Sequence, residues 1–481
     1  MYDVAIVGAG VVGCAAAREL SRFSLKTVVI EKEHDVASGA SGANSGIVHA
    51  GYDAKPGSLK AKFNVLGMRM FEKLKDELSF SFKRNGSLVL EFDKEGYETL
   101  EILKAQGESN GVTNLRIISG NEVRKLEPNL SDNIYAALFA PDAGIVCPYE
   151  MTIALAENAV ENGVEIMLER CVTDIKKKDG SFLIFTPGKV IKAKVIVNAA
   201  GVYSDEINNF LSNHKLKMIP RRGEYCLFDK SLKGFVNHTV FQLPTKMGKG
   251  VLVIPTTRGN ILVGPTSENI ENKDDTATTA DGLLTVLKRA NLSLKSLPHD
   301  MIITSFSGIR AHLESGDFLV EEAADVPGLI NLCGIASPGL TAAPALGEWV
   351  ASKVAEILQP YLNDTFNPLR AKIKPFVSMT IDERAVAIKN DTNYGNIICR
   401  CESVSKAEIL SALNSSLIPN SLDAIKRRTG AGMGRCQGGF CQTRLIDLIA
   451  AECDVDVTDV TKSGKGTNVL ICRNKSGLIL F

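Results

Sequence analysis

The chain has 481 residues, which is too many for one ordinary domain and enough for two or three. Its 45% hydrophobic and 23% charged residues are typical of a globular protein with a large core. Lys and Arg together number 55, as do Asp and Glu, so the formal net charge is zero. This balance excludes a global basic field for nucleic acid or an anionic membrane surface. An anionic substrate must therefore be attracted by a few placed residues.

The expected compartment follows from the N-terminus, the hydropathy and the cysteines. No apolar run approaches the roughly 20 residues that span a bilayer. The first residues enter a strand without the basic start of a signal peptide. We therefore expect a cytoplasmic protein with no transmembrane segment, peripheral to the inner membrane only through a partner. The chain has 11 cysteines, and clustered cysteines in a reducing compartment indicate a metal or cluster before a disulfide.

The first elements predict a strand–turn–helix–strand unit. Residues 2–8 predict an apolar strand, 14–22 a helix and 27–30 a second strand. Together they span about 30 residues, the size of a parallel βαβ crossover. Residues 36–57 are rich in Gly, Ser and Ala and predict a loop, which precedes a helix over 59–78.

The rest of the chain predicts a return to this first domain, an antiparallel sheet and a small third module. Helices are expected over 148–163 and 345–357, and strands at 86–92, 164–168, 181–186, 194–199 and 329–335. Runs bounded by Gly and Pro predict an antiparallel sheet at 224–228, 250–255 and 260–264. Prolines predict a connector over 360–391, and a module follows from residue 396.

Three glycines lie between the first strand and the first helix. Gly8, Gly10 and Gly13 match G-x-G-x-x-G. The first makes a tight turn, the second lets a pyrophosphate approach the backbone, and the third allows helix and strand to pack closely. The helix N-terminus offers N–H groups to the phosphates, and Glu31 at the end of the second strand can accept hydrogen bonds from a ribose. These features predict a dinucleotide site and leave FAD and NAD open.

The serine-rich loop adds a more specific signal. It and several later segments resemble the D-amino-acid-oxidase-like superfamily, which includes glycerol-3-phosphate and L-2-hydroxyglutarate dehydrogenases. The resemblance covers about residues 1 to 360. The segments that carry it are 41–51, 55–62, 198–205, 222–225, 308–310 and 337–341.

This resemblance implies FAD as the resident cofactor and an α/β fold, in which an antiparallel-sheet substrate domain is inserted into a Rossmann-like FAD-binding domain. It also implies that a hydride leaves a carbon bearing a hydroxyl or amine and arrives at the flavin. Beyond the glycine turn and Glu31, the expected cofactor contacts are Ser41, Asn44, Ser45, Ala200, Gly201, Gly339, Leu340 and Thr341.

Two residues are candidates for catalysis. His49 titrates near neutrality and could take a hydroxyl proton as hydride departs, or it could simply shape the flavin loop. The resemblance places Arg310 in the substrate pocket, where its guanidinium matches carboxylate or phosphate oxygens in pairs. A surface salt bridge is the alternative role for Arg310. Arg222 and Tyr225 are weaker candidates for the same pocket.

Four of the cysteines form two close pairs near the C-terminus. Cys399 and Cys401 are followed, after 34 intervening residues, by Cys436 and Cys441. Two such pairs make a four-thiolate cage for a 2Fe–2S cluster or zinc. The glycine-rich residues 429–435 would let backbone N–H groups approach sulfur and tune a cluster's reduction potential.

Residues 396–450 resemble the bacterioferritin-associated-ferredoxin-like (BFD-like) 2Fe–2S domain of some anaerobic glycerol-3-phosphate and opine or amino-acid dehydrogenases. The resemblance implies that electrons leave the flavin singly, for a redox partner protein or a second flavoprotein subunit rather than oxygen. Zinc remains the alternative occupant.

The expected domain limits follow from these assignments. FAD-dependent oxidoreductase residues 1–360 are discontinuous, with FAD-binding parts at 1–80, 145–215 and 305–360 and substrate-domain parts at 81–144 and 216–304. A connector (361–395), the 2Fe–2S domain (396–450) and a tail (451–481) complete the chain.

The predicted function is oxidation of a small anionic secondary alcohol, foremost sn-glycerol 3-phosphate, in the manner of the anaerobic large-subunit enzymes. An L-2-hydroxyglutarate-type enzyme is the alternative, favoured by residues 45–51 and 55–60. An amino-acid or opine dehydrogenase is a further enzyme reading. An electron-transfer subunit without its own turnover is the non-enzymatic alternative.

Overall fold

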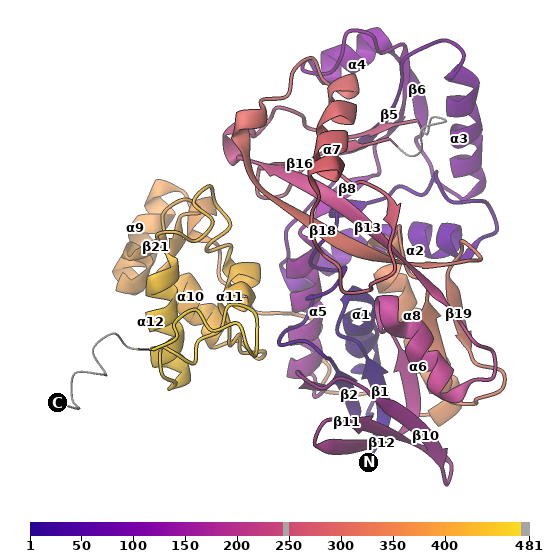
Figure 1. Cartoon of the computed structure of the whole chain (residues 1–481), viewed down its shortest axis with the longest axis vertical. Helices are drawn as coiled ribbons and strands as arrows, with labels where there is room; N and C mark the ends of the chain where they lie inside the picture. The colour runs from indigo at the N-terminus through magenta and orange to yellow at the C-terminus, as the bar shows by residue number, and fades with distance from the viewer. Residues whose placement is uncertain (244–249, 473–481) are drawn as a thin grey trace.

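The computed structural model describes residues 1–243 and 250–472. Two large sheets with their helices form the main body, and a small helical module lies beside it (Figure 1). The module is built from the C-terminal part of the chain.

The first sheet has a parallel core in the order β9-β2-β1-β12-β20. Its first strand is almost wholly apolar and buried, as expected for a strand covered on both faces. A hairpin of β10 and β11 continues the sheet beyond β12, and β19 pairs with β20. The strands are β1 (Tyr2–Val7), β2 (Thr27–Ile30), β9 (Glu165–Met167), β10 (Asp174–Lys178), β11 (Ser181–Thr186), β12 (Lys189–Asn198), β19 (Leu319–Glu322) and β20 (Leu329–Cys333).

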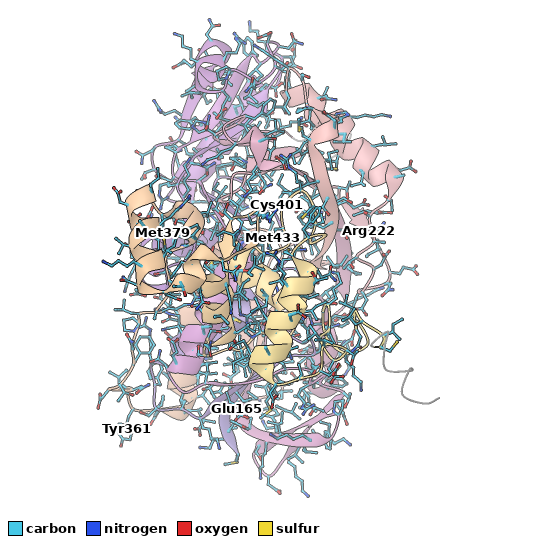
Figure 2. The ribbon with its side chains drawn as sticks, turned by 90° about the vertical axis from the view of Figure 1, so that its left-hand side faces the viewer. Glu165, Arg222, Tyr361, Met379, Cys401 and Met433 are labelled. Atoms are coloured by element: carbon cyan, nitrogen blue, oxygen red, sulfur yellow. The ribbon has the colours of Figure 1, made fainter. Side chains whose placement is uncertain are left out.

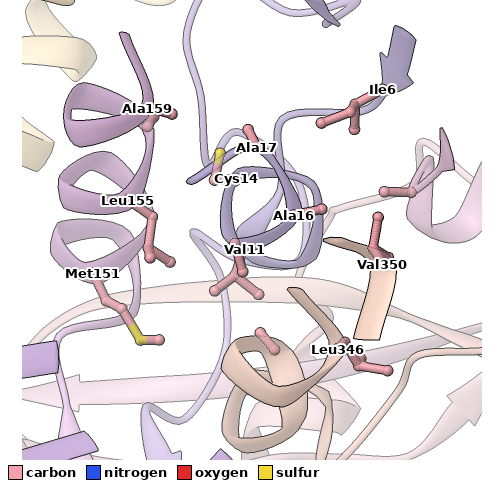
Figure 3. Close-up of a cluster of buried hydrophobic side chains, with 14 of the residues drawn as sticks. Ile6, Val11, Cys14, Ala16, Ala17, Met151, Leu155, Ala159, Leu346 and Val350 are labelled. Atoms are coloured by element: carbon pink, nitrogen blue, oxygen red, sulfur yellow. The ribbon is translucent and has the colours of Figure 1, made fainter. Parts of the chain in front are cut away.

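Four helices pack together on one face of this sheet. They are α1 (Val11–Leu20), α2 (Leu59–Leu78), α5 (Pro148–Glu161) and α8 (Gly339–Leu358). Figure 3 shows the contact between α1, α5 and α8, where Cys14, Ala16, Leu155 and Leu346 are fully or almost fully buried. The small residues on α1 allow this close packing. Helix α6 (Ser204–Leu211) packs against β10 and β20.

The second sheet is mainly antiparallel, in the order β17-β13-β16-β15-β14-β5-β7-β6, with β18 paired to β13. Its strands are β5 (Ser87–Glu91), β6 (Arg116–Ser119), β7 (Ala136–Ala140), β13 (Met218–Phe228), β14 (Thr239–Gln242), β15 (Leu252–Pro255), β16 (Ile261–Gly264), β17 (Glu268–Asn269) and β18 (Ile302–Leu313). Helices α3 (Tyr97–Ser109), α4 (Gly120–Leu126) and α7 (Ala280–Ser293) pack against it.

A third, three-stranded sheet has the order β3-β8-β4. Its strands are β3 (Ile47–Val48), β4 (Phe82–Lys83) and β8 (Gly144–Val146). Strand β3 continues the serine-rich loop, and β8 leads directly into α5.

The C-terminal module has a hydrophobic core of its own, formed by residues such as Ile409, Ile425 and Ile449. Its elements are α9 (Ile381–Asn390), β21 (Ile397–Cys399), β22 (Val404–Ser405), α10 (Lys406–Leu413), α11 (Leu422–Thr429) and α12 (Gln442–Cys453). Buried ion pairs join the module to the main body. Asp35 accepts from Arg428 at 2.8 and 3.0 Å and from Arg427 at 3.0 Å.

The structure places several elements differently from the sequence predictions. Helix α8 begins at Gly339 rather than near residue 345, because Pro344 is accommodated inside the helix. Helix α9 lies within the expected connector. Strand β18 is continuous across residues 304 and 305, where one domain limit was expected. The last part of the expected tail, from residue 473, lies outside the described residues.

Candidate functional site

A cavity of about 1050 Å³ lies between the first sheet and the second. Its wall combines the glycine turn after β1, the serine-rich loop, the start of α8, and strands β13 and β18. The volume is at the upper end of small-molecule sites, enough for a dinucleotide and a small substrate together. Most of the predicted site residues line it: Gly8, Gly10, Glu31, Ser41, Asn44, Ser45, His49, Ala200, Gly201, Arg310, Gly339 and Leu340.

The glycine turn has the close contacts that its motif predicts. Gly8 has a φ of +103°, and a Cβ there would lie 2.5 Å from the carbonyl oxygen of Ala199. A Cβ on Gly13 would lie 2.0 Å from the carbonyl oxygen of Gly8. Any side chain at Gly13 would therefore force α1 away from β1. Gly10 has no side chain to cap α1, so the helix N–H groups that follow Val11 can serve an anion.

Glu31 lies at the cavity wall immediately after β2. Its carboxylate accepts from the backbone N–H of Ala9 at 2.6 Å and from that of Glu33 at 2.9 Å. Burial raises the pKa of Glu31, against the lowering effect of these two hydrogen bonds. The carboxylate therefore holds the glycine turn and still faces the cavity, where a ribose could share it.

The serine-rich loop is held by its own polar side chains. The Ser41 hydroxyl accepts from the backbone N–H of Val11 at 2.8 Å, so it ties the loop to the start of α1. The Asn44 amide donates to the carbonyls of Ala40 and Ser41 at 3.0 Å each and accepts from the Gly46 N–H at 2.8 Å. Asn44 therefore shapes the loop, while its exposed edge lines the cavity.

His49 joins the loop to the start of α8. Its backbone N–H donates to the Thr341 hydroxyl at 3.0 Å, and its ring Nε2 lies 3.4 Å from the Ser337 hydroxyl. The ring also packs against Phe241, with 5.9 Å between ring centres. Thr341 itself is fully buried, so it positions His49 from behind the cavity wall.

Arg310 faces the cavity from β18. Its Nη2 donates to the carbonyl oxygens of Thr266 at 2.5 Å and Arg222 at 3.4 Å, while its buried Nε has no partner. Burial lowers the pKa of Arg310, with Tyr225 opposing this effect. No carboxylate acts on it within the described part of the chain. A buried guanidinium with spare donors in a cavity wall is suited to an anionic ligand.

Arg222 has the opposite environment. Its guanidinium pairs with Asp275 at 2.7 Å, with Glu268 at 2.8 Å and with Glu224 at 3.7 Å. These carboxylates occupy it, and it fixes β13 to the neighbouring segments. Tyr225 does line the cavity, stacked on Phe306 with 5.0 Å between ring centres.

Several cavity residues carried no recognisable signal in the sequence. Phe241, Thr266 and the group formed by Tyr203, Lys273 and Asp274 are among them. Asp274 accepts from Tyr203 and pairs with Lys32 at 3.3 Å, next to the Glu31 end of the cavity. Tyr203 alone lies inside a motif segment, and no local pattern marks the others.

The four predicted cysteines come together in the C-terminal module as two pairs. The sulfurs of Cys401 and Cys436 lie 3.6 Å apart, and the thiols of Cys399 and Cys441 are hydrogen-bonded to each other. This hydrogen bond and the backbone N–H groups of Gly432 and Glu402 lower the pKa of Cys399 to about 6, against its burial. Backbone donors thus reach sulfur from the glycine-rich loop, as its composition predicts.

The pairing distinguishes between the two possible occupants. Two thiolates on one tetrahedral ion lie about 3.8 Å apart, given metal–sulfur bonds of about 2.3 Å. Around a single zinc ion all four sulfurs would share that spacing. Across residues 1–243 and 250–472, no three His, Cys, Asp or Glu side chains form such a group. Two separate thiol pairs fit the two irons of a 2Fe–2S cluster, with one pair for each iron.

The fold and the two sites define a class of protein. Residues 3–353 match the FAD dependent oxidoreductase (DAO) family, and residues 397–451 match the BFD-like 2Fe–2S binding domain. The chain therefore belongs to the family of FAD-dependent oxidoreductases and is a flavoprotein enzyme with an iron–sulfur domain.

Particular relatives narrow this class. The chain is 49% identical, over 99% of both sequences, to a protein of Caloramator mitchellensis named glycerol 3-phosphate dehydrogenase. It is 36% identical to the glycerol 3-phosphate oxidase of Mycoplasma pneumoniae, over 72% of this chain and 92% of the relative. The L-2-hydroxyglutarate dehydrogenase of Bos taurus is 31% identical over 55% of this chain and 60% of the relative.

Solved structures agree with this assignment. The FAD-bound, dithionite-reduced L-alpha-glycerophosphate oxidase of Mycoplasma pneumoniae has a TM-score of 0.74 and 34% identity, over 78% of this chain and 99% of that chain. The FAD complex of glycerol-3-phosphate dehydrogenase from Bacillus halodurans shares the fold, with a TM-score of 0.69 and 17% identity over 95% of this chain and 91% of that chain. None of the helices in the described residues has the length and apolar character to cross a bilayer.

Proposed function

We propose that the chain oxidises sn-glycerol 3-phosphate to dihydroxyacetone phosphate. The observation that carries this proposal is the Arg310 guanidinium in the cavity wall, which lacks a carboxylate partner in the described residues. A phosphate group would supply the missing negative charge and accept from the spare donors. The whole-length relative named glycerol 3-phosphate dehydrogenase supports the same substrate.

The residues around the cavity then take distinct roles. Gly8, Gly10 and the start of α1 would hold the pyrophosphate of FAD, and Glu31 would accept from its ribose. When bound, FAD supplies the acceptor for the hydride that leaves the secondary carbon. Arg310 holds the phosphate and thereby orients that carbon.

His49 is the proposed base for the substrate hydroxyl. Its ring nitrogen faces Ser337 at 3.4 Å in the cavity wall, and Phe241 packs on the ring. The Thr341 contact fixes the backbone at His49, while the Ser337 and Phe241 contacts hold its ring. A neutral imidazole here can take the hydroxyl proton as the carbonyl forms.

The iron–sulfur module favours a dehydrogenase over an oxidase. The cluster, held by Cys399, Cys401, Cys436 and Cys441, supplies a one-electron exit. The solved glycerophosphate oxidase is matched over 99% of its length by only 78% of this chain, so part of this chain has no counterpart in it. We propose a one-electron carrier protein or a second flavoprotein subunit as the acceptor, and a cytoplasmic location.

Anaerobic bleaching of the flavin absorbance tests the substrate. Glycerol 3-phosphate should bleach the flavin, and L-2-hydroxyglutarate should leave it oxidised. The substitution R310Q should raise the glycerol 3-phosphate concentration needed for half-maximal bleaching by at least tenfold, the scale of a lost charge-assisted contact. R221Q, on the neighbouring strand, is the matched control. If only L-2-hydroxyglutarate bleached the flavin, then L-2-hydroxyglutarate and not glycerol 3-phosphate would be the substrate.

A further inference from the structure

The wall of the flavin cavity is linked through hydrogen bonds to the start of α5. Residues 44 to 46 of the serine-rich loop lead into β3, which pairs with β8. The backbone N–H of Val146 donates to the Gly46 carbonyl at 2.8 Å, and a Cβ on Gly46 would lie 2.4 Å from the Val146 carbonyl oxygen. The loop and β8 are therefore in direct backbone contact, and Cys147 and Tyr149 follow at once.

Tyr149, in the first turn of α5 directly after β8, contacts the C-terminal module. Its hydroxyl donates to the sulfur of Met433 at 3.4 Å, and the same hydroxyl is hydrogen-bonded to the Cys147 thiol. Burial raises the pKa of Tyr149 well above its usual value, and the neighbouring Cys147 adds to this effect. The phenol therefore stays neutral and keeps both contacts at any ordinary pH.

Met433 is close to the cysteines themselves. It precedes Gly434, at which a Cβ would lie only 2.3 Å from the Cys401 Cβ, so this backbone rests directly on a cluster ligand. In Figure 2 Met433 and Cys401 are labelled next to each other, whereas Met379 is labelled apart from them. The thioether is polarisable and packs against varied partners. Cys147, Met433 and Cys401 thus follow one another between the end of β8 and the cysteine site.

Arg258, from the second sheet, contacts the same region. Its Nη1 donates to the Thr429 carbonyl at 3.4 Å, and a Cβ on Gly430 would lie 2.2 Å from the same nitrogen. Although burial opposes it, the nearby Tyr149 and Cys147 raise the pKa of Arg258. A permanent positive charge therefore lies near Tyr149 and Cys147.

We propose that Tyr149 and Met433 form the electron-coupling contact between the flavin and the 2Fe–2S cluster. The path runs from the serine-rich loop through Val146 and Cys147 to Tyr149. It continues through Met433 to the backbone next to Cys401. In each passage the reduced flavin loses one electron and one ferric ion of the cluster becomes ferrous. A one-electron acceptor then reoxidises the cluster, so two passages return the flavin to its oxidised form with release of its proton.

Two other contacts near the cysteines lead to the second sheet and not to the serine-rich loop. Arg435 lies next to Cys436 but pairs with Asp229, which follows β13 in the second sheet. Lys230 pairs with Glu402 at 3.0 Å on the same side. These two contacts dock the module, whereas the Tyr149 contact joins the start of α5, directly after β8, to the loop that carries Met433.

Internal electron transfer tests the proposal without any substrate. The flavin of the anaerobic holoenzyme is reduced by a light pulse with EDTA as donor, and reduction of the cluster is then followed by its visible absorbance. Y149F, which loses the hydroxyl, and M433L, which loses the sulfur, should each slow this step about tenfold, the scale on which outer-sphere partners of a metal centre act. Because glycerol 3-phosphate is not used, failure of the proposed substrate would leave this result unaffected.

Matched controls separate coupling from docking. R435Q removes a contact equally near the cluster and should keep the wild-type internal rate, as should M379L elsewhere in the module. Iron content and the midpoint potential of the cluster should be unchanged in Y149F and M433L, which a purely structural role would alter. Wild-type internal rates in both variants would overturn the proposal. Loss of iron or a shifted potential in both would overturn it as well, because the two residues would then serve the cluster's structure.

Discussion

The ion pair at Asp35 is the best place to test how the cysteine module is held against the flavin body. Asp35 follows β2 and is 2% exposed, and it accepts three hydrogen bonds from Arg427 and Arg428 of α11. Arg428 has a side-chain exposure of 4%. The substitution D35N keeps the shape of the side chain and removes its charge, which leaves two cations facing an uncharged amide.

The expected cost follows from this burial. Removing one partner from a buried pair costs about 3–5 kcal/mol, because the remaining charge stays desolvated without compensation. An exposed pair is worth about 0–1 kcal/mol by comparison. Glu157 lies 3.9 Å from the Arg428 Nε and would recover part of the loss, so we expect the lower end of the range. Docking of the module should weaken by about 100-fold, at 1.36 kcal/mol for each factor of ten.

Hydrogen exchange on α11 and on the loop after β2 measures this docking directly. D35N should lose protection in both segments, while FAD and iron stoichiometry stay at the wild-type level. Burial raises the pKa of Asp35, but Arg428 and Arg427 outweigh it and hold that pKa below its ordinary value of 3.8. The stabilisation is therefore fully present above pH 3.8 and is lost only as the pH falls through the lowered value. Protection in the wild type should accordingly be constant from neutral pH down to about pH 5.

The exposed pair of Lys374 and Glu383 in the same module, 2.7 Å apart, provides the control. E383Q should leave the exchange of α11 unchanged. A loss of protection in D35N no larger than that in E383Q would refute the reasoning, since burial would then add nothing to the pair.

Two further predictions concern the cofactors. G13A should abolish FAD binding, measured as flavin absorbance per chain, because its Cβ would lie 2.0 Å from the Gly8 carbonyl oxygen; full flavin content would show that α1 can shift without loss of the site. C436S should remove iron and sulfide, about two of each per chain, while FAD stays bound. C453S in the same module should keep its iron, and stoichiometric zinc in the wild type would reject the assignment of the cluster.

Local patterns in the sequence were sufficient for the parts of the fold that depend on near neighbours. The unit of β1, the glycine turn, α1 and β2 was predicted to within a few residues, because alternation, helix periodicity and glycine placement act over short ranges. Helix α2 begins and ends where expected. The cysteine pairs also meet as expected, since their types and spacing restrict the metal centres they can form.

Long-range pairing decides what the sequence alone left open. Arg222 and Arg310 are the same residue type in neighbouring motifs, yet only Arg222 receives carboxylates, and these come from residues 268 and 275. The Tyr149 contact with Met433 joins residues 284 positions apart and has no motif. Pro344 concealed the start of α8, because a proline inside a helix is unfavourable in isolation, yet the helix runs through it here.

Helix α5 belongs to both halves of the molecule. Its buried face is part of the core around α1, its first turn carries Tyr149, and its Glu157 binds Arg370 at 2.5 Å beyond the main body. Arg310, which is proposed to hold the substrate phosphate, lies by contrast on β18. Changes on that strand can therefore adapt the pocket to another alcohol while the spacing of the two redox centres stays the same. Because α5 is separate from the substrate pocket, substrate specificity can change without altering the contact proposed to carry electrons to the cluster.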